Sequence, residues 1–348
     1  MASHDVIIVG GGAIGLSVAW RCAQRGADVV LLERGELGGG ASRVAAGMLA
    51  PASEAQFGAA GARLLELGLR SAELWPAWAH ELGLAEQLCS RGTLRAARDA
   101  DEAEALEREL DFHARAGLTA RRLRASEARE LEPALAPTLR LAALFAQDSW
   151  IDPRALVPAL AAAAAAAGAQ LREHSPVSGV AAGAIELADG RGELRAERVV
   201  LAAGAWSGEL LAGVPVRPVK GQIMRLRDPA GPGLLSRVVR FDGGYVVPRA
   251  DGRYVVGASV EERGFDEGVT AGAMHELLRS AAELVPGLLE LELEEFSAGL
   301  RPGTPDNVPL IGPGPGGVIL ATGHYRNGIL LAPVTAEILC EQLCGVAA

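Results

Sequence analysis

The sequence predicts an α/β protein of two domains, one built on a parallel sheet and the other on an antiparallel-rich sheet. Short apolar runs, typical of strands buried on both faces, lie near the start, the middle and the end of the chain, at Val6–Val9, Arg198–Leu201 and Val318–Ala321. Between the last two runs, the sequence from Val216 to Val260 is rich in strand and turn signals. This order predicts one domain assembled from separated segments and a second domain formed by the insertions.

The N-terminal segment predicts a strand, a turn, a helix and a second strand. After Val6–Val9 comes a turn of glycines, and apolar side chains then recur every four residues on one helix face, at Ile14, Val18 and Cys22. Gly26 ends this helix, and Val29–Leu32 is the second buried strand. Together these elements form a βαβ unit of about thirty residues.

The turn of this unit carries the pattern Gly10-Gly11-Gly12-Ala13-Ile14-Gly15, which fits G-x-G-x-x-G, and Glu33 ends the second strand about twenty residues later. Gly10 permits the tight turn, Gly12 lets backbone N–H groups approach a diphosphate, and Gly15 lets the helix pack closely on the strand. Glu33 can accept hydrogen bonds from ribose hydroxyls. A glycine turn without a ligand would not need the strand, the helix and the acid together, so we predict a Rossmann-like dinucleotide site.

The rest of the chain predicts further helices and one hairpin. Leu, Ala, Glu and Arg dominate Arg63–Arg129, which predicts helix throughout, ended by the two prolines of Leu131–Pro137. Asp251-Gly252 separates two β-rich runs, which is a strong hairpin signal. The hairpin strands are Tyr245–Pro248 and Tyr254–Val256, and further helices are predicted over Arg154–Ala167, Ala273–Val285 and Ile338–Leu343.

Composition excludes several classes of protein. A formal net charge of -10 disfavours nucleic-acid binding and docking on an anionic membrane, because no basic stripe is available. The N-terminus lacks the pattern of a signal peptide, and the longest apolar stretch, around Leu156–Ala167, is too short and Ala-rich to span a bilayer, so we expect a cytoplasmic protein. None of the six histidines forms an HExxH motif, and we expect no metal site. Cys340 and Cys344 lie one helical turn apart; ordinary packing is favoured over metal ligation.

The fingerprint alone does not distinguish NAD from FAD. Four further segments resemble the D-amino-acid-oxidase-like family of FAD-dependent oxidoreductases, and the glycine oxidases within it: Ala41–Pro51, Pro176-Val177, Val199–Ser207 and Gly323–Pro333. Arg43 departs from the family pattern, in which a small residue often stands, and we favour a solvated side chain there over a charge beside the diphosphate. The resemblance covers nearly the whole chain and is loosest between Arg63 and Arg140.

The resemblance implies the cofactor and the residues that hold it. Some relatives hold FAD covalently through a cysteine in the C-terminal third; no cysteine occurs here between Cys89 and Cys340, so we predict non-covalent FAD. The predicted cofactor-binding residues are Gly10, Gly12, Ala13, Ile14, Gly15, Glu33, Arg34, Ala41, Ser42, Ala46, Gly47, Met48, Val177, Gly204, His324, Tyr325, Arg326, Asn327, Gly328, Ile329 and Leu330. The predicted FAD-binding domain comprises 1–80, 146–220 and 300–348; an α+β substrate-binding domain comprises 81–145 and 221–299.

Three residues are predicted to serve the substrate. The segment Leu300–Asp306 resembles the family segment that supplies a carboxylate-binding arginine, here Arg301, and Pro302-Gly303 predicts a rigid turn just after it. Tyr245 stands where the family often has a substrate-facing tyrosine, and Arg326 stands at a second substrate-contacting position beside the flavin. A surface arginine and a core tyrosine are the alternatives for Arg301 and Tyr245. Val260 falls where a more flexible side chain can line the pocket in relatives, and its small size leaves room for a larger substituent.

The activity implied by the resemblance is an FAD-dependent oxidase of glycine or a related small amine acid, such as sarcosine, an N-substituted glycine or a small D-amino acid. Its expected partners are this substrate and oxygen, its products an imine and hydrogen peroxide, and the family links the imine to thiamine synthesis. A homo-oligomer is possible. Three alternatives stay open: an FAD dehydrogenase with another electron acceptor, a nicotinamide-dependent dehydrogenase, and a non-catalytic flavin-binding subunit.

Overall fold

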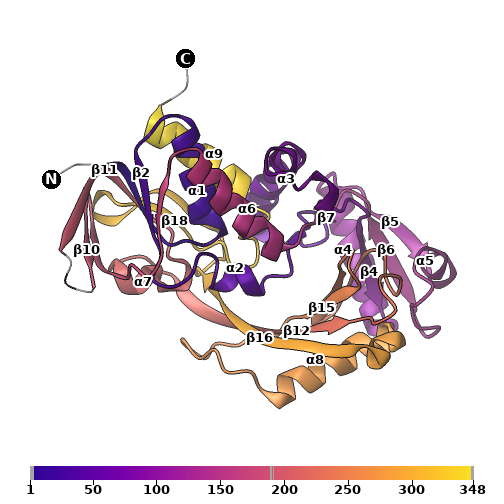
Figure 1. The fold of residues 1–348 in the computed structure, drawn as a ribbon. Helices are drawn as coiled ribbons and strands as arrows, with labels where there is room; N and C mark the ends of the chain where they lie inside the picture. The colour runs from indigo at the N-terminus through magenta and orange to yellow at the C-terminus, as the bar shows by residue number, and fades with distance from the viewer. Residues whose placement is uncertain (1–3, 189, 191, 346–348) are drawn as a thin grey trace.

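A computed structural model describes residues 4–188, 190 and 192–345, and Figure 1 shows their arrangement. One sheet has the order β17-β18-β11-β1-β2-β8, with a short antiparallel extension of β9 and β10 on β11. Its neighbouring strands from β18 to β8 are parallel, and β17 joins antiparallel at the edge. The strands are β1 (His4–Val9), β2 (Val29–Leu32), β8 (Gln170–Arg172), β9 (Val177–Ala181), β10 (Ala184–Leu187), β11 (Glu193–Leu201), β17 (Leu310–Pro313) and β18 (Ile319–Thr322).

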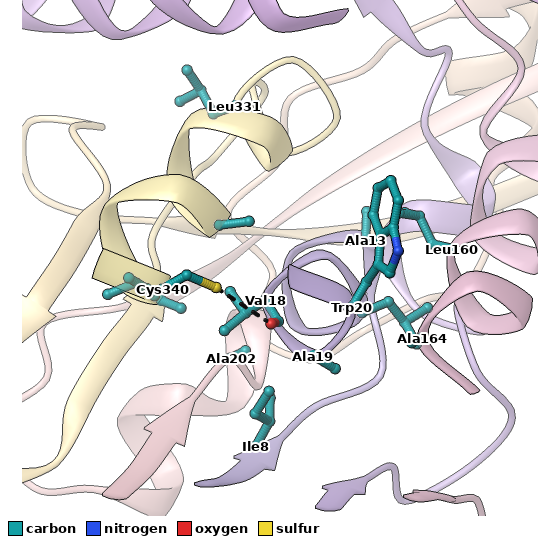
Figure 2. Close-up of a cluster of buried hydrophobic side chains, with 14 of the residues drawn as sticks. Ile8, Ala13, Val18, Ala19, Trp20, Leu160, Ala164, Ala202, Leu331 and Cys340 are labelled. Carbon is teal, nitrogen blue, oxygen red and sulfur yellow. Dashed lines mark hydrogen bonds between the residues drawn. The ribbon is translucent and has the colours of Figure 1, made fainter. Parts of the chain in front are cut away.

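Helices cover one face of this parallel sheet (Figure 1). Helix α1 packs against both α6 and α9, and α3 packs on α9. Figure 2 shows how small side chains let these helices approach: Ala19 of α1 and Ala164 of α6 lie near Trp20. The helices are α1 (Ala13–Gln24), α3 (Gly58–Glu81), α6 (Pro153–Ala166) and α9 (Ala332–Cys344).

The second sheet has the order β16-β12-β15-β14-β13-β4-β6-β5 and is antiparallel except where β13 pairs with β4. Helix α8 packs on β12, β14 and β15, and α4 packs on β4 and β6. The elements are β4 (Thr93–Ala97), α4 (Ala100–Arg115), β5 (Arg121–Arg124), α5 (Ala125–Leu131), β6 (Leu141–Phe145), β12 (Arg217–Arg227), β13 (Val238–Phe241), β14 (Gly244–Pro248), β15 (Arg253–Gly257), α8 (Ala271–Leu284) and β16 (Glu292–Gly303).

Short elements complete the fold. β3 (Met48–Leu49) pairs with β7 (Ser149–Trp150), and α2 (Ala41–Val44) and α7 (Ser207–Leu210) are single turns of helix. Turns of 3-10 helix cover Ala85–Gln87, Gly204–Trp206, Pro286–Glu290 and Pro315–Gly317. The predicted fold class is therefore confirmed: a Rossmann-like parallel unit joined to an antiparallel-rich α+β unit.

Two predictions about individual elements are wrong. The stretch Arg63–Arg129 is not helical throughout, because it contains β4 and β5. All five side chains of Thr93–Ala97 are buried between strands β13 and β6, so sheet pairing overrides the helix preference of its Ala and Leu residues. The second error is the turn at Pro302-Gly303, since both residues lie within β16. β16 is an edge strand, where proline is tolerated because its missing N–H would face away from the sheet.

Other expectations match closely. The hairpin around Asp251-Gly252 forms between β14 and β15, with Pro248 opposite Tyr254. β1, α1 and β2 occupy the predicted βαβ positions, and the predicted strand at Arg198–Leu201 is the end of the longer β11. The domain boundaries given above stay a prediction.

Candidate active site

A single elongated cavity of about 1140 Å³ runs from the carboxyl edge of the parallel sheet to one face of the second sheet. One end is lined by the glycine turn after β1, and the other by side chains of β13, β14 and β16. Nearly all predicted cofactor residues line it: Gly10, Gly12, Ala13, Ile14, Glu33, Arg34, Ala41, Ser42, Ala46, Gly47, Met48, Val177, Gly204, His324, Tyr325, Arg326, Asn327, Gly328 and Ile329. The two exceptions are Gly15 and Leu330.

The glycine turn leaves no room for side chains. Gly10 has φ +114°, and a Cβ there would lie 2.4 Å from the carbonyl oxygen of Ala202. A Cβ on Gly15 would lie 1.9 Å from the Gly10 carbonyl oxygen, so Gly15 serves helix–strand contact and not the cavity wall. The turn thus brings bare backbone and the start of α1 to the cavity, the arrangement that suits a diphosphate.

Glu33 is held at the end of β2 by two backbone donors. Its Oε2 accepts from Gly11 N at 2.7 Å, and its Oε1 accepts from Gly35 N at 3.0 Å. The carboxylate lines the cavity with acceptor capacity left over, as a partner for ribose hydroxyls requires. Arg34 beside it places its guanidinium 3.6 Å from the ring centroid of Trp206, which also lines the cavity. Trp206 was not among the predicted site residues.

The loop of small residues after β2 closes over the start of α1. Ser42 Oγ accepts from Ala13 N at 3.0 Å, so this side chain ties the loop to the first turn of α1. Gly47 has φ +76°, and a Cβ there would clash with the carbonyl oxygen of Ile151. Arg43 is exposed and does not line the cavity, in agreement with the favoured solvated interpretation.

The C-terminal loop between β18 and α9 lines the cavity from the opposite side. His324 is buried, its Nε2 lies 3.0 Å from Thr335 Oγ1, and burial lowers its pKa to about 3, so its ring is neutral at neutral pH. Leu330 points away from the cavity into the core. Its carbonyl oxygen accepts from Ser71 Oγ at 2.6 Å and from Trp75 Nε1 at 2.9 Å, which fixes the end of the loop on α3.

Arg301 is a half-buried cation at the far end of the cavity. Its Nη1 donates to the carbonyl oxygens of Ser259 at 3.0 Å and Lys220 at 3.3 Å, and burial is the main cause that lowers its pKa. Within the part of the chain that the structure describes, no carboxylate lies within 4.0 Å of this guanidinium. Gly221 makes room for it, since a Cβ there would lie 2.2 Å from Nη2. The guanidinium therefore keeps donors available for an anionic ligand.

Tyr245 stands beside this arginine on β14 and lines the cavity. Burial raises the pKa of its hydroxyl, and the positive charge of Arg301 partly offsets the rise. Gly257 on β15 lies opposite Tyr245, and a Cβ there would come 2.7 Å from the tyrosine hydroxyl oxygen. The ring therefore lies across bare backbone, with a neutral hydroxyl close to the Arg301 charge. Arg326 and Val260 also line the cavity; Arg326 is exposed, and Val260 is 51% exposed.

The sequence analysis missed an acidic residue and an arginine in the same part of the cavity. Glu54 and Arg240 both line it, and their side chains form an ion pair of 3.6 Å. Arg240 also donates to the carbonyl oxygen of Ser53, which fixes this loop on β13. Arg240 lies directly opposite Tyr245 in the sheet register. The sequence offered one signal for this pair, namely that Glu54 follows shortly after the small-residue loop. No spacing rule connects Glu54 to Arg240, because β13 lies far along the chain.

A buried carboxyl group lies next to this cavity loop. Asp148 is fully buried, and burial raises its pKa to about 6, an effect opposed by the hydroxyl groups of Ser53 and Thr93 and by the charge of Arg240. No cluster of three or more His, Cys, Asp or Glu residues that could hold a metal ion is found within the described ranges. No helix among the described residues is long and apolar enough to cross a membrane.

The comparison with protein families decides the identity of this site. The profile of the family described as DAO, FAD dependent oxidoreductase, matches residues 5–342. The chain belongs to this family. Its cofactor is FAD, and the cradle of bare backbone, the Glu33 carboxylate in the cavity wall and the long cavity fit that molecule. The predicted resemblance is thereby confirmed, and the protein is an FAD-dependent oxidoreductase of the glycine-oxidase type.

Individual relatives agree over nearly the full length. Glycine oxidase of Geobacillus kaustophilus is 38% identical across 97% of this chain and 92% of that protein, and its crystal structure superposes with a TM-score of 0.92 at 37% identity, covering 99% and 95% of the two chains. Iminodiacetate oxidase from Chelativorans sp. BNC1 superposes with a TM-score of 0.87 at 29% identity, covering 99% and 96%. The bifunctional protein ThiO/ThiG of Synechocystis sp. is 37% identical over 98% of this chain and 52% of that protein.

Proposed function

We propose that this amino-acid oxidase oxidises glycine or a related small amine acid, such as sarcosine, another N-substituted glycine or a small D-amino acid, and passes the electrons to oxygen. The observation that carries this proposal is Arg301, a half-buried guanidinium without a carboxylate partner among the described residues, at the end of the cavity away from the glycine turn. A planar fork of N–H donors suits a carboxylate, and a partly desolvated, uncompensated cation favours binding of an anion.

The neighbouring residues complete a complementary site for an amino acid. Burial raises the pKa of Tyr245 and keeps its hydroxyl neutral, so the hydroxyl donates a hydrogen bond to the carboxylate held by Arg301. Glu54, whose charge is paired with that of Arg240, places carboxylate oxygens in the same pocket that can accept hydrogen bonds from the amino group of the substrate. Arg326 in the cavity wall is a second contact for the substrate. FAD supplies the oxidising chemistry and reacts with oxygen to give hydrogen peroxide, while these side chains hold the amine in one orientation. We expect the FAD to be bound non-covalently.

A panel of small amines tests the substrate class. Purified holoprotein is mixed without oxygen with glycine, sarcosine, iminodiacetate, D-alanine and methylamine, and bleaching of the yellow flavin absorbance is followed. We expect rapid bleaching with one or more of the acids and slow bleaching with methylamine, which lacks the carboxylate. Equal bleaching by methylamine would contradict the role of Arg301 in selecting the substrate.

Admission of oxygen tests the electron acceptor. The bleached protein should recover its colour in air and release hydrogen peroxide in proportion to the amine consumed. If the colour returns only with an artificial quinone, the protein is a dehydrogenase and the oxidase proposal fails. The likeness to the ThiO/ThiG proteins leads us to propose further that the imine feeds assembly of the thiamine thiazole ring. Growth without thiamine of a host that lacks its own glycine oxidase, rescued by this chain, tests that assignment.

A further inference from the structure

Three of the four cysteines meet where the ends of two helices pack together. Cys22 of α1 and Cys340 of α9 are fully buried, and their Sγ atoms lie 3.0 Å apart. Cys344 follows one turn later on α9, close enough to Cys22 for each of these two thiols to shift the pKa of the other. Figure 2 shows Cys340 pointing from α9 toward α1, where its Sγ lies 3.8 Å from the carbonyl oxygen of Val18. The fourth cysteine, Cys89, forms an isolated backbone β-bridge with Trp150 and lies outside this cluster.

The three thiols differ in access and in acidity. Cys344 is only half-buried, whereas the other two are closed off from solvent. A hydrogen bond from Cys22 and the charge of Arg25 lower the pKa of Cys344 to about 7, although burial opposes them. Cys22 has its pKa raised by its thiol neighbours and by burial. An accessible thiolate with a second, protonated thiol in contact is the arrangement that reacts with peroxides and then closes a disulfide.

We propose that Cys344 and Cys22 form a peroxide-reactive dithiol that closes a disulfide between α9 and α1. In the first step the Cys344 thiolate attacks one oxygen of hydrogen peroxide, the O–O bond breaks, and Cys344 sulfenic acid and hydroxide form; the hydroxide takes up a proton to become water. In the second step Cys22 loses its proton and attacks Cys344 Sγ, which forms the S–S bond and expels the sulfenic oxygen as water. Two thiols are oxidised and one peroxide is reduced to two waters.

The position of the dithiol gives this reaction a structural effect. Helix α1 starts at the glycine turn, and α9 starts directly after the loop that lines the cavity with His324. A disulfide between Cys22 and Cys344 would close a loop of nearly the whole chain and fasten together two helices that begin at the cofactor. Long closed loops restrict the unfolded chain strongly, so the oxidised protein should unfold at a higher temperature. The production of peroxide by the protein itself depends on the oxidase activity proposed above. The reaction of the thiols with added peroxide does not depend on that activity.

Direct treatment with peroxide tests the dithiol. Reduced holoprotein is exposed to hydrogen peroxide, its remaining thiols are blocked, and intact mass, peptide maps and thermal unfolding are measured. Relative to reduced protein that has been blocked in the same way, we expect a mass lower by two blocking groups, a Cys22–Cys344 linked peptide, and a Tm raised by several degrees that dithiothreitol reverses. Cys344→Ser should abolish all three changes. Cys22→Ser should trap the sulfenic acid on Cys344 for labelling with dimedone, and Cys89→Ser, the matched control, should behave as wild type.

Two outcomes would overturn the proposal. One is a protein whose Cys22 and Cys344 stay free thiols after treatment with peroxide, while its flavin absorbance shows that it is folded. The other is a Cys344→Ser variant that closes a disulfide as fast as wild type. A second arm replaces added peroxide with glycine and air, with and without catalase. A disulfide that forms with added peroxide but not during turnover supports the dithiol and contradicts only the production of peroxide.

Discussion

The two ends of the cavity are lined by different kinds of chemical group. At the end that holds the glycine turn, the cofactor end, bare backbone predominates: Gly10, Gly12 and Gly15 lie within six residues, and a Cβ on Gly10 or Gly15 would meet one of the protein's own carbonyl groups. At the opposite end, which we propose as the substrate end, side chains predominate: Arg301, Tyr245 and Glu54 come from three distant segments. This difference affects prediction from sequence. A backbone site can be predicted from one short motif, whereas a site made of side chains depends on which strands pair.

The two ends should therefore fail differently when single residues change. A change at the backbone end should act through steric clash and loss of the cofactor. A change at the side-chain end should spare the cofactor and act on the capture of substrate. Each variant below tests whether this division holds.

The largest effect is expected from Gly10→Ala. The new Cβ would meet the Ala202 carbonyl oxygen at 2.4 Å, and the residue would have to keep a φ of +114°. We expect a loss of more than about 4 kcal/mol in the free energy of unfolding, or a folded protein without FAD. Flavin absorbance and thermal unfolding measure both. Gly272→Ala is the control, since a Cβ there meets nothing within 4 Å; a Gly10 variant as yellow and stable as this control would contradict the steric argument.

The next effect is expected from Arg301→Ala. Removal of one partner of a desolvated charge pair costs on the order of 2–5 kcal/mol, equal to roughly 30-fold to several-thousand-fold weaker capture of substrate. FAD content should be unchanged, and Arg301→Lys should recover part of the loss, because it keeps the charge without the planar fork. The measurement is kcat/KM for the acid and for an amine without the carboxylate. A variant that keeps its preference for the acid would show that the anchor lies elsewhere, with Arg326 next in line.

Asp148, which lies near the substrate end, makes the free energy of unfolding depend on pH. Folding raises its pKa from 3.8 to about 6, so its favourable contribution is complete below about pH 4 and is lost as the pH rises through 6. A shift of this size corresponds to about 3 kcal/mol. Asp148→Asn should therefore gain stability over wild type at about pH 7.5 relative to about pH 5. Thermal unfolding of both proteins at the two pH values checks this; an unchanged difference would mean that Asp148 stays ionised without penalty.

The smallest effect is expected from Gly221→Ala. Its Cβ would lie 2.2 Å from Arg301 Nη2, so the guanidinium must shift, but a flexible side chain can do so. We expect KM for the substrate to rise about tenfold, equal to about 1.4 kcal/mol, with FAD content and kcat nearly unchanged. Steady-state kinetics and flavin absorbance separate these quantities. If this variant loses FAD instead, the division between the two ends is wrong.

At the cofactor end, the sequence by itself placed the glycine pattern, the helix periodicity and Glu33 in one βαβ unit, because local spacing suffices to bring them together. The other cofactor residues were predicted from the family resemblance, and the structure brings 19 of the 21 predicted cofactor residues to one cavity. Gly15 and Leu330 are the exceptions, since one serves helix packing and the other turns its side chain into the core.

Only the tertiary structure decided the substrate end. Resemblance to relatives singled out Arg301 and Tyr245, but the Pro302-Gly303 turn proved to be part of a strand, and Glu54 and Arg240 were missed. The physical reason is the separation along the sequence between residues that are in contact. Arg240 donates a hydrogen bond to the carbonyl oxygen of Ser53, which lies 187 positions earlier, and β4 is stabilised by pairing with β6 and β13. Periodicity reports which face of an element is buried, whereas the strand that will lie beside it depends on the whole chain.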